Sequence, residues 1–341
     1  MEWIAGDIGG TKSWLVWVTD TPGAGPLLRF ERVYESAAFA AAEDLIRRFM
    51  SDAQMKAVPD GMLLALPGPV DAQRTTLTNL HWILDAEELR ARLGIGSVRF
   101  INDFQAAAAG VATLTAADVI ALNPQSPEFG GVRAITGAGT GLGLAFMLPD
   151  AGGRYRSYPT EGGHIDFAPA NVQQANLLTH LQAVYGHVSW ERVASGSAMN
   201  DLYRFCCLQQ QRPLPDAPMD GATLAAAAQS GDAAAEAALE LFIDLYGAWV
   251  GNVALLYQPR GGLYIAGGVA THMQSRMQSP RFMAAATDKG RMRSVVERIP
   301  VFLIGNNRLG VQGAIASACV QEQHDASPFS NFNAAVNRSG T

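Results

Sequence analysis

The sequence contains little cysteine, and its few charges are on balance negative. Three of the 341 residues are cysteines, two adjacent (Cys206 and Cys207) and one distant (Cys319), so neither a CxxC zinc motif nor a disulfide framework is expected. Charged residues make up 16% of the chain and give a formal net charge of −6. Because nucleic acids and membrane surfaces bind basic faces, this charge argues against both as partners.

Targeting and membrane segments are also not expected. The stretch Met1-Glu2-Trp3 carries no basic region ahead of an apolar one, so it does not resemble a signal peptide. No uninterrupted apolar run is as long as a membrane span. Together with cysteines that fit buried, reduced side chains, these features predict a cytoplasmic protein. The 48% of hydrophobic residues and the 35 glycines are typical of a folded α/β protein with one large or two medium domains.

The sequence does contain one order of elements that occurs twice. Short β-branched or aromatic runs between glycines and prolines predict strands, and longer runs with helical spacing predict helices. In the first half the expected strands are 3–8, 13–18, 27–34, 61–66 and 98–101, and the expected helices are 38–53, 86–93 and 104–115. The second half repeats three strands within 132–159, followed by helices at 171–184, 197–210 and 222–257 (broken near 230–232), strands within 261–269 and 299–305, and a closing helix at 310–320. This doubled βββαβα order predicts two related α/β halves with a cleft between them.

Two turns rich in glycine and threonine lie at corresponding places in these halves. The first, AGDIGGTKSW (residues 5–14), lacks the Walker A spacing, and neither it nor TGAGTGLG (residues 136–143) opens the helix that a dinucleotide-binding fingerprint needs. Each fits a β-hairpin whose glycines let backbone N–H groups approach an anion, with Thr11 as a hydroxyl donor and Asp7 holding a hydrated Mg²⁺. An ordinary hairpin is the alternative for one such turn. Two of them can grip a polyphosphate from both sides of a cleft.

Several motifs together carry a family resemblance. GDIGGTK, INDFQAAAAG, GAGTGLG, EGGHIDFAP, GHVSWERVASG and IAGGV occur in the order seen in bacterial glucokinases, which the sequence resembles from about residue 4 to residue 318. Those enzymes belong to the actin/hexokinase/Hsp70-like ATPase superfamily. GDIGGTK alone also fits the related ROK sugar kinases, but these usually add a cysteine-rich zinc motif after the EGGH-like histidine, which this sequence lacks. The resemblance therefore favours the bacterial glucokinase branch.

The resemblance implies a fold, a reaction and partners. The fold is α/β, with two actin-like/ribonuclease H-like βββαβα domains flanking a cleft: a small domain (1–113) completed by a C-terminal helix at about 305–321, a large domain (114–304) and a polar tail (322–341). The reaction is the phosphorylation of glucose at its 6-hydroxyl by ATP with Mg²⁺, in a homodimer. One alternative is a kinase for another hexose or an N-acetylhexosamine. Another is a non-catalytic sugar-sensing protein of the same fold.

The candidate sugar site centres on Asn102 and Asp103, at the end of a predicted strand. Phosphoryl transfer to a hydroxyl needs a base near the acceptor oxygen, and Asp103 fits that role, although an aspartate here could simply cap the next helix. The resemblance assigns the base to Asp103. It also implies that one edge of the sugar is held by Asn102 and Asp103 and the anomeric edge by Glu161, His164 and Glu191, with Asn79 as a weaker candidate.

The candidate nucleotide site consists mainly of the two turns. Its residues are Gly6, Asp7, Ile8, Gly9, Gly10, Thr11, Gly137, Gly139, Thr140, Gly141, Gly267 and Gly268, with Asp7 binding Mg²⁺ through water. Two positions depart from the family pattern. Lys12 replaces a common asparagine, and either adds charge at the phosphates or is simply solvated. Trp14 replaces a common arginine and is expected to face a core.

Overall fold

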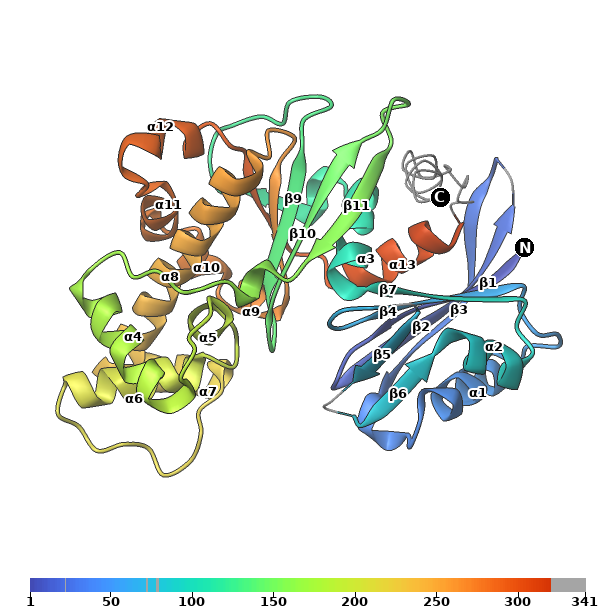
Figure 1. Ribbon diagram of the computed structural model, residues 1–341, viewed down its shortest axis with the longest axis horizontal. Coiled ribbons are helices and arrows are strands. Elements are labelled where there is room, and N and C mark those ends of the chain that lie inside the picture. The colour runs from blue at the N-terminus through green and yellow to red at the C-terminus, as the bar shows by residue number, and fades with distance from the viewer. Residues whose placement is uncertain (22, 72, 78–79, 320–341) are drawn as a thin grey trace, which may run out of the picture.

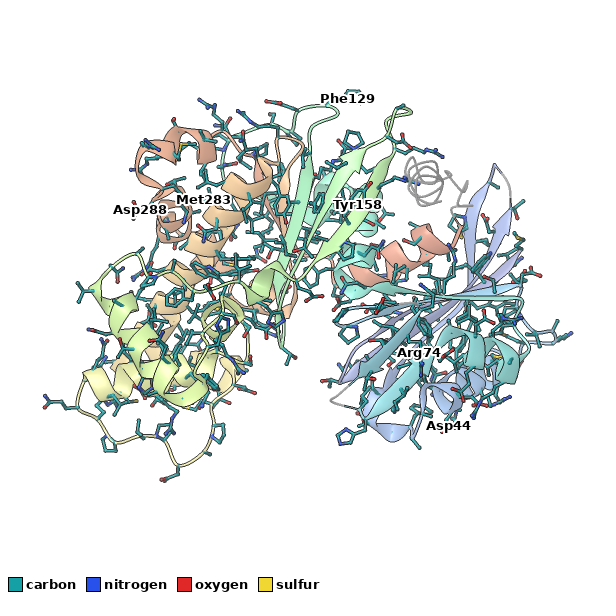
Figure 2. The ribbon with its side chains drawn as sticks, viewed as in Figure 1. Asp44, Arg74, Phe129, Tyr158, Met283 and Asp288 are labelled. Atoms are coloured by element: carbon teal, nitrogen blue, oxygen red, sulfur yellow. The ribbon has the colours of Figure 1, made fainter. Side chains whose placement is uncertain are left out.

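The structure, a computed structural model, describes residues 1–319 apart from residues 22, 72 and 78–79. It has two lobes, each built on one β-sheet, with helices α3 (Asp103–Gly110) and α13 (Leu309–Cys319) between them (Figure 1). Side chains gather around each sheet separately (Figure 2). Asn79 and the tail predicted for residues 322–341 lie outside the described residues.

The first lobe is built on a five-stranded sheet in the order β3-β2-β1-β4-β7. One face packs against helices α1 and α2 through residues such as Phe49 and Leu89, and the other packs against α13 through Val311 and Ala314. Because both faces are covered, all six residues of β4 are buried. The elements of this lobe are β1 (Glu2–Ile8), β2 (Lys12–Thr21), β3 (Gly25–Glu35), α1 (Ala42–Asp52), β4 (Gly61–Leu66), β5 (Arg74–Leu77), β6 (Trp82–Asp85), α2 (Ala86–Leu93) and β7 (Ser97–Asn102).

The second lobe is built on a six-stranded sheet in the order β11-β10-β9-β12-β13-β8. Its strands are β8 (Val119–Ala121), β9 (Arg133–Ala138), β10 (Leu142–Pro149), β11 (Tyr155–Thr160), β12 (Leu263–Ala266) and β13 (Val301–Ile304). Its helices are α4 (Val172–Tyr185), α5 (Glu191–Ala194), α6 (Met199–Gln209), α7 (Gly221–Gln229), α8 (Ala233–Tyr257), α9 (Gly268–His272), α10 (Gln274–Met277), α11 (Pro280–Thr287) and α12 (Arg293–Val296). Short 3-10 turns in the chain are η1 (Ser36–Ala38), η2 (Val111–Thr113), η3 (Ala116–Asp118), η4 (Gly162–His164) and η5 (Gly290–Met292).

Apart from the edge strand β8, the two sheets have the same topology. In chain order, the first sheet places its strands third, second, first, fourth and fifth, and β11-β10-β9-β12-β13 repeats this arrangement. The predicted doubled βββαβα order is therefore confirmed. In both sheets the first, fourth and fifth strands are parallel. One edge of each sheet thus collects the carboxyl ends of these strands and the turn after the first strand, which is where α/β proteins place their ligands.

Helix α8 is the most apolar long helix among the described residues. Glu236, Glu240 and Asp244 interrupt its apolar residues, so it is not an uninterrupted apolar run, yet it has 25 residues and a mean hydropathy of 1.4 over its most apolar 18-residue window. In the structure 72% of that window is buried inside the protein. Trp249 and Tyr246, two of the largest fully buried side chains, lie on it. The high hydropathy of α8 therefore reflects its place in the core of the second lobe.

Some short elements were not predicted, and some boundaries differ. The helix expected at 38–53 begins at Ala42, and the one expected at 104–115 ends as an α-helix at Gly110 and continues as η2. The hairpin of β5 and β6, strand β8 and helices α5 and α9–α12 were missed. None of these elements exceeds eight residues, which is too short for a helical or strand period to be recognised.

Candidate active site

The turn between β1 and β2 is stabilised by a hydrogen bond inside the turn and by hydrogen bonds from Ser36, which lies after β3. The amide of Gly9 donates to the carbonyl oxygen of Lys12 at 2.9 Å. Behind the turn, the hydroxyl of Ser36 donates to the carbonyl oxygen of Gly9 at 2.7 Å and lies 2.8 Å from the hydroxyl of Ser13, and both serines are fully buried. The amide of Ser36 also donates to the carbonyl of Thr11 at 3.0 Å. Ser36 therefore supports a turn whose tip is exposed, and the sequence analysis missed it.

Asp7 and Asp103 come together because β1, β4 and β7 are parallel neighbours. Asp7 is opposite Ala65 of β4, which is opposite Ile101 of β7, and Asp103 follows two residues later. Asp7 is half-buried, and burial raises its pKa to about 6. Within the described part of the chain, no hydrogen-bond donor reaches its carboxylate. Its oxygens are thus free for a hydrated cation, and Mg²⁺ is commonly bound through one or two carboxylates plus substrate phosphates.

The structure gives the cap of helix α3 to Asn102, not to Asp103. The side-chain oxygen of Asn102 accepts from the amides of Phe104 (2.9 Å) and Gln105 (3.1 Å). Its side-chain nitrogen donates to the carbonyl oxygen of Gly68 at 3.0 Å. The alternative that Asp103 is the helix cap is therefore wrong. Asn102 itself keeps only one unused N–H, so it can offer a ligand a single hydrogen bond.

Asp103 has the pKa of a base suited to neutral pH. Burial raises the pKa of its carboxyl group to about 7, with further increases from the charges of Asp7 and Glu161, against a hydrogen bond from the amide of Phe104 that lowers it. That amide donates to Oδ1 of Asp103 at 2.8 Å. General-base catalysis is most efficient when the pKa of the base lies near the working pH.

The three residues expected at the anomeric edge of the sugar also come together. Nε2 of His164 lies 3.9 Å from Oε2 of Glu161 and 4.0 Å from Oε2 of Glu191. Glu161 directly precedes the 3-10 turn η4, His164 is its last residue, and Glu191 begins α5. The two segments are joined by the amide of Trp190, which donates to the carbonyl of Ile165 at 3.0 Å. This cluster offers both donors and acceptors, as vicinal hydroxyl groups require.

The turn between β9 and β10 matches the first turn in position. The amide of Gly139 donates to the carbonyl of Gly141 at 2.9 Å, and the carbonyl of Gly139 accepts from the amide of Gly196 at 2.7 Å. Gly139 and Thr140 are exposed at its tip. Leu142, which follows the turn, donates its amide to Oε2 of Glu191 at 2.9 Å. This bond links the second turn to the sugar-side cluster.

The remaining candidate glycines have different surroundings. Gly137 lies within β9, where a β-carbon would stand 2.6 Å from the carbonyl oxygen of Ala266 and 3.0 Å from the ring of Phe104, so its missing side chain serves packing. Gly267 has φ of +98°, a conformation that favours glycine, and directly precedes α9. Gly268 has open space around it.

Two further candidates, Gly6 and Ile8, lie inside the first sheet. Gly6 and Ile8 are buried in β1, and the side chain of Ile8 belongs to the apolar core, which leaves only its backbone for a ligand.

The two positions that depart from the family pattern lie on β2. Lys12 is exposed at the start of β2. Trp14 is half-buried and packs against the core beneath α13, with the guanidinium of Arg308 at 4.9 Å from its ring centre.

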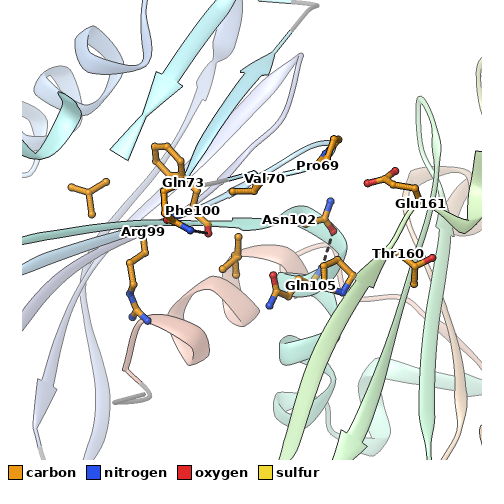
Figure 3. Close-up of a pocket in the computed structure, with 12 residues that line it drawn as sticks. Pro69, Val70, Gln73, Arg99, Phe100, Asn102, Gln105, Thr160 and Glu161 are labelled. Carbon is orange, nitrogen blue, oxygen red and sulfur yellow. Dashed lines mark hydrogen bonds between the residues drawn. The ribbon is translucent and has the colours of Figure 1, made fainter. Parts of the chain in front are cut away.

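A cavity of about 680 Å³ lies between the two lobes, beside Asn102 and Glu161 (Figure 3). Asn102 faces it from the end of β7, and Glu161 faces it from the opposite lobe. Pro69 and Val70, which come after β4, form another wall. The side chain of Gln73, also in the lining, is fixed against β7, because it accepts from the amide of Phe100 at 2.7 Å and donates to the carbonyl of Phe100 at 3.3 Å. Pro69, Val70 and Gln73 were not among the site residues that the sequence predicted.

The arrangement is a two-sided site with few cations. In the part of the chain that the structure describes, no group of three or more His, Cys, Asp or Glu side chains could hold a metal ion by itself. The site therefore offers backbone amides of two turns, the paired carboxylates of Asp7 and Asp103, and a polar cluster across a cavity. Such a site suits an anionic ligand that brings its own metal ion and a polyhydroxylated ligand beside it.

Comparisons with known proteins agree with this arrangement. A family model described as Glucokinase matches residues 4–322. A glucokinase of Synechocystis sp. is 36% identical over 349 aligned residues, which cover 93% of this chain and 98% of the relative. A glucokinase of Yersinia pestis is 34% identical and covers 91% of this chain and 94% of the relative.

Solved structures give the same result. The crystal structure of a glucokinase from an Antarctic psychrotroph has a TM-score of 0.79 at 29% identity, covering 93% of this chain and 98% of that one. A ROK family glucokinase from Streptomyces griseus, solved in complex with glucose and AMPPNP, shares the fold with a TM-score of 0.58 at 20% identity, covering 92% and 98% of the two chains. On the family model and the full-length relatives, the chain belongs to the glucokinase family.

Proposed function

We propose that this chain transfers the γ-phosphoryl group of ATP to the 6-hydroxyl of glucose. The observation that carries the proposal is the position of Asp103, a carboxylate with a pKa of about 7 between the carboxylate of Asp7 and the polar cluster at Glu161. The chain is similar, over nearly its whole length, to proteins that are named glucokinases. One relative of the same fold was solved with glucose and AMPPNP, an ATP analogue.

Each part of the site has a role in this reaction. Asp103 accepts the proton of the 6-hydroxyl as that oxygen attacks the γ-phosphorus, and ADP leaves on the opposite side. Glu161, His164 and Glu191 hold the hydroxyls at the other edge of the sugar, and Asn102 adds the one N–H that it has left. The turn amides that no described residue accepts from, those of Gly10, Thr11, Thr140 and Gly141, stabilise phosphate charge.

A divalent ion fits beside Asp7. Its half-buried carboxylate accepts no hydrogen bond from the described residues, and the formal net charge of the chain is −6. When bound, Mg²⁺ neutralises charge that develops on the phosphates. Asp7 would hold it through water, as the resemblance implies.

The hinge between the lobes is part of the proposal. Residues 1–113 with α13 would move against residues 114–304, and α3 and α13 lie between the two sheets. Closure on the sugar would exclude water from the transferred phosphoryl group. Saturating glucose should therefore give a more compact particle in small-angle scattering. An unchanged scattering curve, with binding confirmed by calorimetry, would count against closure.

The direct test is ATP consumption with a panel of hexoses and N-acetylhexosamines, with Mg²⁺ and after chelation. Glucose should be the best acceptor, and chelation should abolish turnover. Preference for another sugar would replace glucose in the proposal, and sugar binding without turnover would favour a sensor. A cytoplasmic location and a homodimer are proposed on the same resemblance, and light scattering after size exclusion tests the dimer.

A further inference from the structure

The sugar-side and phosphate-side parts of the site meet at Leu142, the first residue of β10. Its amide donates to Oε2 of Glu191 at 2.9 Å. Its carbonyl oxygen lies against Gly163, in the turn between Glu161 and His164, so closely that a β-carbon at position 163 would overlap it. Both segments proposed to hold the sugar thus contact the residue that ends the second glycine turn.

The contact between Glu191 and this turn depends on Gly141. A β-carbon at position 141 would stand 2.6 Å from Oε2 of Glu191, which is inside van der Waals contact. The φ of Gly141 is outside the left-handed region, so the position needs glycine for space and not for conformation. Gly139, two residues earlier in the same turn, differs in this respect, because no described atom lies within 4 Å of its β-carbon position.

We infer that Glu191 couples the binding of sugar to the binding of nucleotide, an inference that rests on the proposed function. Oε2 of Glu191 is occupied by the amide of Leu142, while Oε1 accepts no hydrogen bond from the described residues and is available to a sugar hydroxyl. A hydroxyl bound at Oε1 fixes the carboxylate in the position that holds Leu142. The turn at residues 138–142 is then already ordered when the phosphates arrive, so each ligand tightens the other. Linkage requires that the factor be the same in both directions.

Calorimetry can measure this factor directly. The dissociation constant of AMPPNP with Mg²⁺ is determined with and without saturating glucose, and the ratio of the two values is the coupling factor. In the unmodified protein, glucose should tighten AMPPNP by at least about 5-fold, the lower end of ordinary coupling between sites. In Gly141→Ala, the new methyl group displaces the carboxylate from Leu142, and the factor should fall toward one.

Gly139→Ala is the matched control. It places the same methyl group in the same turn but in open space, so it should keep the coupling factor of the unmodified protein. A change in AMPPNP affinity itself does not affect the comparison, because the factor is a ratio within one variant. If Gly139→Ala loses the coupling as well, general stiffening of the turn explains the result and the inference is overturned.

The other outcomes are also decisive. An unmodified protein without coupling, or a Gly141→Ala protein that keeps it, overturns the inference while leaving the kinase assignment intact. If Gly141→Ala fails to fold, Glu191→Asp is measured instead, since its shorter side chain does not reach the amide of Leu142, and retained coupling there has the same meaning. If neither glucose nor AMPPNP binds the unmodified protein, the proposed function itself fails, which is a distinguishable result.

Discussion

Gly310 of helix α13 lies directly against the carboxylate of Asp7 in strand β1. A β-carbon at position 310 would overlap Oδ2 and Cγ of Asp7. The two residues are at opposite ends of the chain, and they meet because α13 packs on the first sheet through Val311 and Ala314. The last described helix therefore sets the space in which the proposed metal-binding carboxylate can lie.

We predict that Gly310→Ala raises the concentration of Mg²⁺ that turnover requires. The methyl group must push the carboxylate of Asp7 aside, although alanine itself favours a helix. The Mg²⁺ concentration for half-maximal turnover should rise about tenfold, an effect typical of disturbing groups that orient a metal's surroundings. A coupled kinase assay with titrated MgCl₂ measures this, and the affinity for glucose should not change. Gly221→Ala in α7, where the nearest atom to the β-carbon is 3.9 Å away, is the control. An unchanged Mg²⁺ requirement in Gly310→Ala would contradict the role of Asp7.

We predict that Asp103→Asn lowers turnover by about 10²–10⁴-fold, the usual loss when a general base is removed. The helix cap is unaffected, because Asn102 provides it. The affinity for glucose should fall far less, since Glu161, His164 and Glu191 remain. Turnover is measured by coupled assay and affinity by calorimetry. A folded Asp103→Asn protein with nearly full activity would remove Asp103 from the mechanism.

The same substitution should change the dependence of stability on pH. Burial raises the pKa of Asp103 to about 7 from its ordinary value of 3.8, so the folded protein binds this proton more tightly than the unfolded chain. The stability that this proton contributes is fully present below about pH 4 and is lost as the pH rises through about 7. At pH 8 without Mg²⁺, Asp103→Asn should therefore melt at least about 2 °C above the unmodified protein, and the difference should shrink toward pH 4. Asp216→Asn, at an exposed position, should show no such trend. A lower melting temperature for Asp103→Asn at pH 8 would contradict the raised pKa.

Ser36→Ala should loosen the first turn. The substitution leaves the partly buried carbonyl oxygen of Gly9 without its 2.7 Å hydrogen bond and should cost about 1–3 kcal/mol of unfolding free energy. Because the turn is proposed to hold phosphate, the KM for ATP should rise while the KM for glucose stays the same. Denaturant unfolding and a coupled assay measure the two effects. Ser51→Ala, at an exposed position on α1, is the control. A stable variant with an unchanged KM for ATP would show that the turn does not need this support.

Much of the fold could be predicted because its strands and longer helices have clear periods and glycine boundaries. The pairing of Asp7 with Asp103 was also accessible in principle, since Asp7 lies near the carboxyl end of β1 and Asp103 directly follows β7, a strand of the same parallel set. The sequence analysis named both residues from motif and resemblance. Helix α2 was predicted with its observed limits, Ala86–Leu93.

The features that could not be predicted depend on contacts between distant segments. Ser36 reaches Gly9 only through the pairing of β2 with β3, and that pairing shifts register between Trp17 and Val18. The choice of Asn102 over Asp103 as helix cap depends on where β7 ends: Asn102 has an extended backbone and Asp103 is already the first helical residue. Gly141 looked like part of a phosphate turn, but its missing side chain makes room for Glu191, which is 50 positions later in the chain.

The packing of α13 on the first sheet has a consequence for how the protein is made. The last strand of that sheet ends at Asn102, but the helix that covers one of its faces begins at Leu309. At ordinary rates of translation, roughly 10–40 s separate the synthesis of these two points. Throughout that interval the apolar face formed by Ala5, Val16 and Leu63 has no α13 to cover it. The sheet that leaves the ribosome first is therefore completed last, and a chain whose synthesis stops before residue 309 keeps this face open.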